Sequence, residues 1–457
     1  MDLLQNPFHI LNATPRDNRR KIVELAEERS LVMDSRECTQ ARSDLINPRK
    51  RLSAEVAWLP GLSPKRTKRL LKSLNNSTEE LSATTGLPAM ARANLLAACL
   101  LRLKASSSPK HVAKSIYKLV LTFEDINPEE LRAIINEDRV VSGFPMVTDI
   151  SAVEAEIHER RLQYRSVMKS ALNTLDPRKL VKVVTFITEL TTNKGEKHPP
   201  TLIADLVDLY EVEAQPFFKK EGENIETLVE KIRQAADGKK SDAILERLVA
   251  QLIQVVKNWA MIAQPIQVSK KSRGLDHDAS NHIALIVRDL AIHLFNEHGK
   301  LDLSQRLTSM LQEVFAGVQV VAEIISEDSK TLNEIARQQA RLIEDVKKQA
   351  KKWRSEITYE ANMGVFSKSK LRISPEGIEW KNRRWELNSI TSVRWGGILR
   401  SGTRPTYTII FATNSDSVTI EVKRKDVYDN FVERLWKAVG VRILTDLLEG
   451  LKSGKRY

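Results

Sequence analysis

The sequence contains no apolar run long enough to cross a bilayer. Its most apolar stretches, residues 95–103 and 314–325, are short or interrupted, whereas a spanning helix needs about 18 residues. Cysteine is also scarce: Cys38 and Cys99 are too few for a disulfide framework or a zinc cage and suit a reducing compartment. The first ten residues lack a basic segment followed by an apolar one, so we expect no export signal and a cytoplasmic protein.

Motifs that position catalytic or phosphate-binding groups are also missing. The sequence has no glycine-rich phosphate loop, no G-x-S-x-G and no H-E-x-x-H. Asp278 and His282 are four residues apart, a spacing that would let both side chains reach one metal ion from a helix. Asp278 and Ser280 also suit the start of a helix over residues 281–295, which is the interpretation that we favour. We therefore expect no catalytic site, no metal and no cofactor, and we expect the two cysteines to be buried thiols.

What the sequence does contain is charge, unevenly distributed. Of its 457 residues, 42% are apolar and 29% charged, and the mean hydropathy is −0.32, values typical of a packed protein with two to four domains. The formal net charge of +13 divides into +6 over residues 1–75, −1 over residues 76–364 and +8 over residues 365–457. Basic ends favour nucleic acid, anionic lipid or acidic protein as partners, although lysine and arginine also serve simply to solvate a surface.

The first sixty residues predict three short helices. Thr14 followed by Pro15 is a helix-start signal, a second helix is expected over residues 37–46, and a third begins at Asn47 and stops by residues 60–61. The segments NPFHILNATPRDNRRKI and DLINPRKRLSAE within this region resemble the two ends of a J domain.

J domains stimulate Hsp70 chaperones through a His-Pro-Asp tripeptide in the loop after their second helix. The corresponding loop here, residues 31–36, reads LVMDSR, so only the aspartate, Asp34, is present. The resemblance, which covers about residues 6–58, therefore implies a docking module over residues 1–61, which we call the head. An Hsp70 co-chaperone with a diverged tripeptide is an alternative.

A basic linker over residues 62–88 and a helical body over residues 89–361 are expected next. The pairs Asn127-Pro128 and Asp176-Pro177 are typical helix starts. Helix breaks are predicted at residues 142–145, at residues 194–200, near residue 238 and at residues 264–281, which favours helical hairpins.

The last helix of the body carries a coiled-coil-like seam. Over residues 331–358, side chains that are mostly apolar recur at steps of three and four from Leu332 to Ile357. Gln339 is the one polar residue in this series. Such a seam either joins two copies of the chain or lies along the body of the same chain, and we favour the second.

After residue 364 the apolar period changes from about 3.6 to 2. Short strands are predicted from Leu371 to Val422, with Gly396 ending one of them, followed by a helix over residues 426–439. The segment LRISPEGIEWKNRRWELNSITSVRW resembles the opening strands of a bacterial pleckstrin-homology-like domain, which implies a C-terminal domain over residues 362–445 and a basic tail over residues 446–457. In that family the loops carry binding, and such domains also serve as docking or oligomerising units. The residues expected to meet an anion or a partner are Arg383, Arg384, Arg394, Lys423, Arg424 and Lys425 in this domain and Arg49, Lys50 and Arg51 in the head.

The fold class expected is mainly α with a C-terminal α+β domain. The function expected is that of a non-catalytic adaptor or scaffold in a bacterial multiprotein complex, associated by analogy with stress or phage defence. The alternative is a nucleic-acid-binding accessory subunit acting through the basic ends. Protein partners are expected, membrane contact is not, and a homo-oligomer would form through residues 331–358.

Overall fold

The computed structural model describes residues 2–74, 81, 84–103, 107–363, 369–401 and 404–452, without the side chains of residues 319–320, 397–401, 404 and 452. The fold is mainly α with a C-terminal α+β region, as predicted. The chain divides into two compact units, of which the first comprises Met1–Lys231, Arg247–Val287 and Met310–Ile324, and the second Ile232–Glu246, Arg288–Ser309 and Ile325–Tyr457. Among the described helices, none combines the length and the apolarity that a bilayer crossing requires.

The head consists of short capped helices. They are η1 (Leu3–Gln5), α1 (Pro7–Ile10), α2 (Arg19–Ser30), α3 (Ser35–Ile46) and α4 (Pro48–Val56), followed by α5 (Pro64–Leu74). The predicted helix start at Thr14 is wrong, because α2 begins after Asn18, whose side chain accepts from the Lys21 N–H at 2.9 Å. Thr14 instead donates its N–H and its hydroxyl to the Asp17 carboxylate, at 2.6 and 3.0 Å. Such local side-chain bonds hold the backbone in a loop and compete with helix formation.

The segment predicted as a linker contributes to the core of the head. Leu70 and Leu74 of α5 are buried in the same cluster as Phe8 and Trp58, together with Leu95 of α7 (Ala89–Leu100). The side chains of α5 repeat at helical spacing, so its lysines and Arg69 are exposed while Leu70 and Leu74 are buried. The head is therefore packed against the segments that follow it in sequence.

The body is a series of helices. They are α8 (Pro109–Glu124), α9 (Pro128–Ser142), α10 (Ile150–Leu172), α11 (Pro177–Thr192), α12 (Thr201–Asp237), α13 (Asp242–Ser272), α14 (Asp278–Asn296), α15 (Leu301–Val314) and α16 (Gln319–Glu356). Asn127 and Asp176 cap α9 and α11 as predicted, each with proline at the first helical position. The break predicted over residues 264–281 is present but shorter, because α13 continues through Pro265 to Ser272 and α14 begins at Asp278. A proline removes one helical hydrogen bond, and the burial of Ala263 and Ile266 on either side of it offsets that loss.

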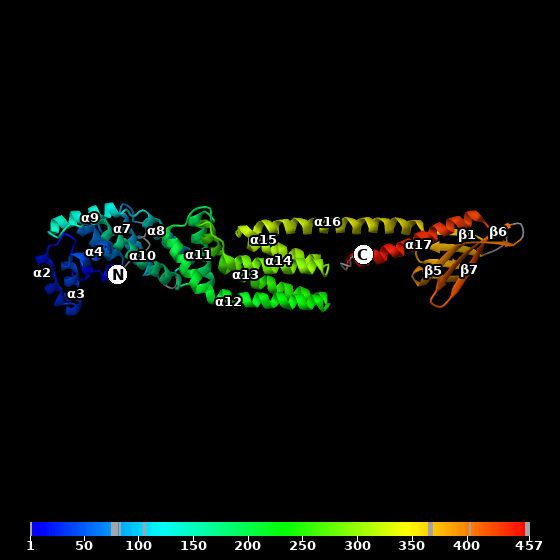
Figure 1. Cartoon of the computed structure of the whole chain (residues 1–457), viewed down its shortest axis with the longest axis horizontal. Coiled ribbons are helices and arrows are strands. Elements are labelled where there is room, and N and C mark those ends of the chain that lie inside the picture. Colours follow the sequence, from blue (N-terminus) through cyan, green and yellow to red (C-terminus); the bar gives the residue numbers. More distant parts are fainter. Residues whose placement is uncertain are drawn as a thin grey trace. The chain divides into compact units, whose positions relative to one another are not determined.

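The C-terminal domain contains two antiparallel sheets and one helix (Figure 1). The first sheet has the order β1-β2-β3-β4 and the second the order β5-β6-β7. The elements are β1 (Tyr359–Asn362), β2 (Lys370–Ser374), β3 (Gly377–Trp380), β4 (Arg383–Trp385), η2 (Leu387–Ser389), β5 (Ile390–Ser401), β6 (Arg404–Thr413), β7 (Ser417–Val422) and α17 (Lys425–Lys452). Alternate strand residues such as Ile373, Ile409 and Phe411 are buried, and Phe431 and Leu435 of α17 complete their core.

Three boundaries of this domain differ from the sequence prediction. Strand β1 precedes the expected start, and β5 continues past Gly396, whose φ of +109° accompanies a register irregularity between Trp395 and Gly397. Helix α17 extends to Lys452, so the predicted tail is helical up to that residue. Residues 453–457 of the predicted tail lie outside the described residues.

The seam of α16 is met by α17 of the same chain (Figure 1). Gln339 Nε2 donates to the Leu451 carbonyl at 2.8 Å, and the rings of Trp353 and Trp436 are 5.1 Å apart. The later residue of α16 meets the earlier residue of α17, so the two helices run antiparallel. At these two points the seam therefore contacts the C-terminal helix of its own chain.

Candidate functional site

The three basic residues predicted in the head have different environments. Arg49 is exposed, and Lys50 is exposed and forms an ion pair with Asp44 at 3.0 Å. Arg51 is completely buried and is not available to an anion in solution, so its predicted role is corrected by the structure. Every third or fourth residue of a helix returns to the same face, and α4 turns that face toward the core at Arg51.

Arg51 belongs to a buried ionic network. Its Nε donates to Glu55 Oε1 at 2.7 Å, and Arg139 Nε of α9 donates to Glu55 Oε2 at 2.9 Å. The guanidinium of Arg51 also lies 3.8 Å from the centre of the Phe144 ring and donates to the Pro15 carbonyl at 2.7 Å. The network joins α4, α9 and the α1–α2 loop, and its role is structural.

The α2–α3 loop, where a J domain has its tripeptide, exposes two apolar side chains. Leu31 is 85% and Val32 is 73% exposed. Asp34 is the N-cap of α3, and its carboxylate accepts from the Arg36 N–H at 2.7 Å. The aspartate shared with the tripeptide is thus engaged in capping, and the loop presents an apolar tip.

The arginines of the β3–β4 hairpin lie beside carboxylates. Arg383 Nη1 is 3.5 Å from Asp416 Oδ2, and Arg384 Nη1 is 3.8 Å from Glu379 Oε1, all in exposed side chains. Arg383 and Arg384 line a hollow of about 780 Å³ that also contains both Glu379 and Glu360. Positive charge in this hollow is therefore partly balanced within the chain.

The other predicted basic residues lie elsewhere on the domain. Arg394 is exposed on β5, and Lys423, Arg424 and Lys425 are exposed after β7. Hydrogen bonding between Arg424 and Asp426 lowers the pKa of the Asp426 carboxyl. Asp416, the partner of Arg383, precedes β7, whereas Lys423 follows it, so six strand residues separate the two sites by about 20 Å.

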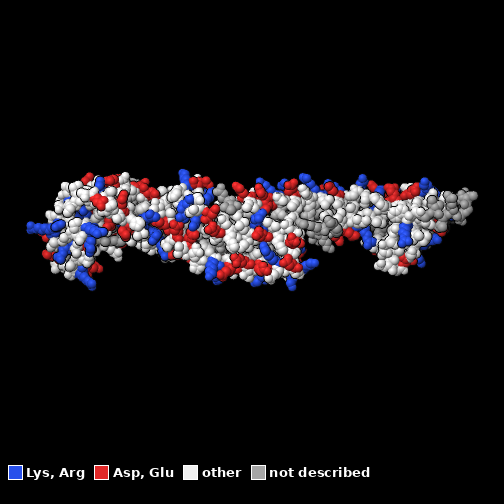
Figure 2. Space-filling model, in the orientation of Figure 1, with Lys and Arg blue, Asp and Glu red and all other residues white. Residues whose placement is uncertain are grey.

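The predicted basic residues therefore lie on different parts of the domain, although Lys370, Arg372 and Lys381 join Arg383 and Arg384 around the hollow. In the view of Figure 2, lysines and arginines alternate with aspartates and glutamates over the described surface. Mixed charge of this kind solvates a protein and does not build the continuous positive field that steers a polyanion.

A groove between β5 and α17 is the candidate site that the structure brings together. It has a volume of about 340 Å³, and its lining combines Leu387, Ile390, Val393 and Trp395 with Leu435, Ala438, Val439 and Ile443, besides polar residues at its margins. Trp395 is 42% exposed and Ile443 62% exposed, although both are large apolar side chains. Arg442 Nη1 donates to the Ile390 carbonyl at 2.7 Å and so fixes α17 against the start of β5.

Strand β5 is the edge of its sheet. In the described part of the chain it pairs only with β6, where Val393 faces Phe411 and Trp395 faces Ile409. The opposite side of an edge strand carries backbone N–H and C=O groups that can pair with a further strand. The groove therefore combines an edge strand, whose Ile390 carbonyl accepts from Arg442, with an apolar wall.

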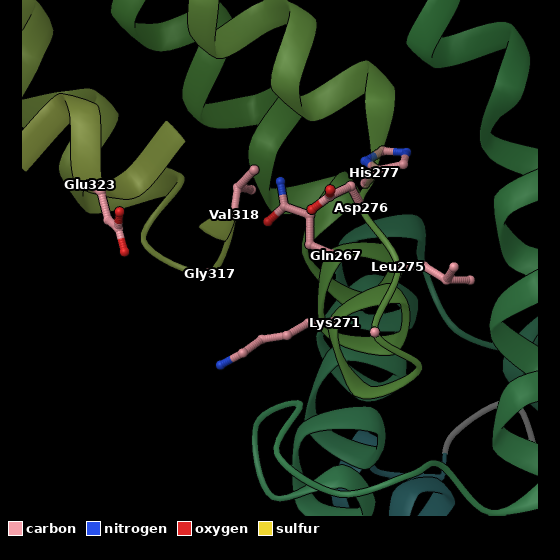
Figure 3. Close-up of a pocket in the computed structure, with 9 residues that line it drawn as sticks. Gln267, Lys271, Leu275, Asp276, His277, Gly317, Val318 and Glu323 are labelled. Atoms are coloured by element: carbon pink, nitrogen blue, oxygen red, sulfur yellow. The ribbon is translucent and has the colours of Figure 1, made fainter. Parts of the chain in front are cut away.

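A polar cavity in the first unit is the main alternative (Figure 3). It has a volume of about 390 Å³, and Gln267, His277 and Asp276 lie together on one side of it while Lys271 extends from another. Two of its polar groups already have partners: Gln267 Nε2 donates to Ser280 Oγ at 2.7 Å, and Lys271 Nζ to Glu196 Oε1 at 2.6 Å.

His277 and Ser280 form a pair of a type also used in nucleophilic catalysis, with Nδ1 and Oγ 2.6 Å apart. Ser280 is completely buried, however, so its hydroxyl has no access to a substrate. Burial also lowers the pKa of His277, which stacks on Trp259. We interpret this pair as interior packing.

Asp278 and His282, whose four-residue spacing could suit a metal ion, have different roles in the structure. His282 Nε2 lies 3.1 Å from Glu226 Oε1, and Asp278 stands in the first turn of α14, where a carboxylate suits the helix macrodipole. Cys38 and Cys99 are buried, as predicted, and burial raises the pKa of the Cys99 thiol to about 12.

The groove was missed by sequence reasoning because its two walls are distant in sequence. One signal was present: Ile443 follows Val439, the last residue of the predicted C-terminal helix, at the four-residue spacing of one helix face. Comparisons of the chain with protein-family models, with curated proteins and with solved structures found no match. The two resemblances noted in the sequence therefore stay predictions.

Proposed function

We propose that the protein is a non-catalytic adaptor of a multiprotein complex, and that its C-terminal domain holds an extended segment of a protein partner along β5. The observation that carries this proposal is the position of β5 at the edge of its sheet beside an apolar groove. Trp395, Val439 and Ile443 remain exposed there, although a protein gains stability by burying such side chains.

The physical basis is strand addition. An extended segment that pairs with β5 satisfies the backbone groups of the edge, and every second side chain of the segment enters the groove. Tryptophan is among the residues that contribute most to binding when a partner covers them. The exposed Leu31-Val32 tip of the α2–α3 loop is a second apolar surface, as suits a protein that joins partners.

The charge distribution favours a protein partner over nucleic acid. Phosphate binding by several lysines and arginines releases counterions, so its affinity falls by orders of magnitude between about 50 and 200 mM salt. The predicted basic residues Arg383, Arg384 and Arg424 each lie beside a carboxylate, which reduces their attraction for phosphate. An apolar groove loses far less affinity over the same range of salt.

The test is purification of the full chain from its own cells at about 50 and 200 mM salt. Wild type is compared with Ile443→Glu and with Val141→Glu, a control on α9 whose wild-type side chain has the same exposed fraction, 62%. We expect one protein to co-purify with wild type and with the control at both salt concentrations, and to be lost from Ile443→Glu. In the purified complex, amide exchange of residues 390–396 should be slower than in the free chain.

Two results would contradict the proposal. One is a partner that binds Ile443→Glu as well as wild type, because the groove would then not be its site. The other is co-purification of nucleic acid at the higher salt concentration without any protein, which would favour the nucleic-acid-binding alternative.

A further inference from the structure

Two histidines and one aspartate converge where α12 and α14 end (Figure 1). Asp237 is the last residue of α12, His293 lies in the last turn of α14, and His298 follows in the loop after that helix. All three belong to the second unit. His298 Nε2 is 2.9 Å and His293 Nε2 is 3.2 Å from the same atom, Asp237 Oδ1.

The backbone after α14 holds the two histidines together. Gly299 adopts a φ of +63°, a conformation that glycine reaches without strain. Its N–H donates to the Phe295 carbonyl at 3.0 Å, and the Lys300 N–H donates to the Leu294 carbonyl at 2.9 Å. The chain is thereby folded back over the last turn, which places the His298 ring 5.1 Å from the His293 ring.

We propose that Asp237, His293 and His298 form a site for a transition-metal ion such as Zn²⁺. Imidazole nitrogens with one carboxylate oxygen are a common zinc ligand set, whereas Mg²⁺ and Ca²⁺ prefer oxygen ligands. Bonds of about 2.0–2.1 Å in a tetrahedron place neighbouring ligand atoms about 3.3 Å apart. The two nitrogen–oxygen distances of 2.9 and 3.2 Å are within a few tenths of an ångström of that value.

The surroundings also favour a cation. Both α12 and α14 end at the site, and the aligned peptide dipoles make the C-terminal end of a helix partly negative. A carboxylate at the last residue of a helix is repelled by this negative end, so a cation bound to Asp237 relieves the repulsion. The nearby ammonium of Lys300 is directed to Asp242, with Nζ and Oδ1 2.6 Å apart.

The site is accessible to solvent. Asp237 is 60% exposed, and the two histidine side chains are half-buried. An ion can therefore reach the site from solvent, and a water molecule would supply the fourth ligand. Since the three ligands come from two helix ends, a bound ion would fasten the end of α12 to the end of α14.

The test uses the full chain without an affinity tag, because a histidine tag would bind the same ions. Zn²⁺ binding is measured by calorimetry, and Co²⁺ is added separately because its visible absorption identifies tetrahedral coordination. The variants are His293→Ala, His298→Ala and Asp237→Asn. The control is His282→Ala. His282 lies on α14, as His293 does, but is paired with a single carboxylate, that of Glu226 on α12.

We expect one Zn²⁺ per wild-type chain and a tetrahedral Co²⁺ spectrum. Each variant of the site should weaken binding by about 100-fold or more, since loss even of residues that only support metal ligands weakens binding by 10–100-fold. The control should bind as wild type does. Zn²⁺ should also raise the melting temperature of wild type and of the control, and leave that of His293→Ala unchanged.

Asp237→Asn keeps the size of the side chain, so it separates loss of the ligand from loss of the fold. If its melting temperature without metal equals that of wild type, weaker binding is due to the missing carboxylate. The proposal is overturned if wild type shows no tetrahedral Co²⁺ spectrum. It is also overturned if Zn²⁺ binds the three variants as tightly as it binds wild type.

Discussion

Replacing Glu55 by glutamine should strongly destabilise the head. The carboxylate is buried between two buried guanidinium groups, with Arg51 Nε at 2.7 Å and Arg139 Nε at 2.9 Å. Glutamine has nearly the same shape but no charge, so both arginines would remain buried without a counter-charge. Removal of one partner from a buried ion pair costs about 3–5 kcal/mol, and we expect Glu55→Gln to fall in that range.

Amide hydrogen exchange of the full chain is the appropriate assay. A chain with more than one unit does not unfold in a single two-state step, so one melting temperature would not isolate the head. Exchange through local opening reports the stability of α4 and α9 directly. Because each 1.4 kcal/mol is a factor of ten, protection of these two helices should fall by about two to four orders of magnitude.

The matched control is Glu24→Gln, which removes an exposed carboxylate 3.2 Å from Arg20 in α2. An exposed pair contributes about 0–1 kcal/mol, so protection of α2 should change by less than about fivefold. The reasoning would be refuted if Glu55→Gln changed the protection of α4 and α9 no more than the control changes that of α2.

Three further outcomes are expected. The pKa of His277 is lowered by burial, so the unfolded chain binds the proton more tightly than the folded one. The melting temperature should therefore fall as the pH drops below about 6.5, and His277→Asn should reduce this dependence on pH. An unchanged dependence would contradict the lowered pKa of His277. A Cβ at residue 440 would lie 2.3 Å from the Trp353 ring, so Gly440→Ala should destabilise the contact between α16 and α17 by about 1–3 kcal/mol. The measurement is amide exchange in α17, which should become faster. Unchanged exchange would show that the Trp353 ring moves away without cost. Because the α2–α3 loop lacks the His-Pro of a J domain and its Asp34 caps α3, the full chain should not accelerate ATP hydrolysis by an Hsp70; acceleration that is lost in Asp34→Asn would revive the co-chaperone alternative.

Local signals in the sequence determined much of the secondary structure. Asn127-Pro128 and Asp176-Pro177 start helices because a short polar side chain and a fixed φ act within one turn of the chain. The change of apolar period after residue 364 predicted the C-terminal sheets, because alternate residues of a strand face opposite sides. Both signals depend on neighbours in sequence, so they can be read without the fold.

Tertiary structure decided which of these side chains are used, and for what. Arg51 and Lys50 are adjacent and equally basic in sequence, yet one is buried against Glu55 and the other lies in solvent, because only the packing of α4 determines which face is covered. In the body, the burial of Ala263 and Ile266 likewise keeps α13 helical through Pro265.

The candidate sites depend on tertiary structure for the same reason. The β5–α17 groove joins Trp395 to Ile443, and the proposed metal site joins Asp237 to His298, across about fifty or sixty residues in each case. Spacing within one helix or strand predicts which residues share a face. Contacts between elements arise only when those faces pack, so the sequence alone did not bring these residues together.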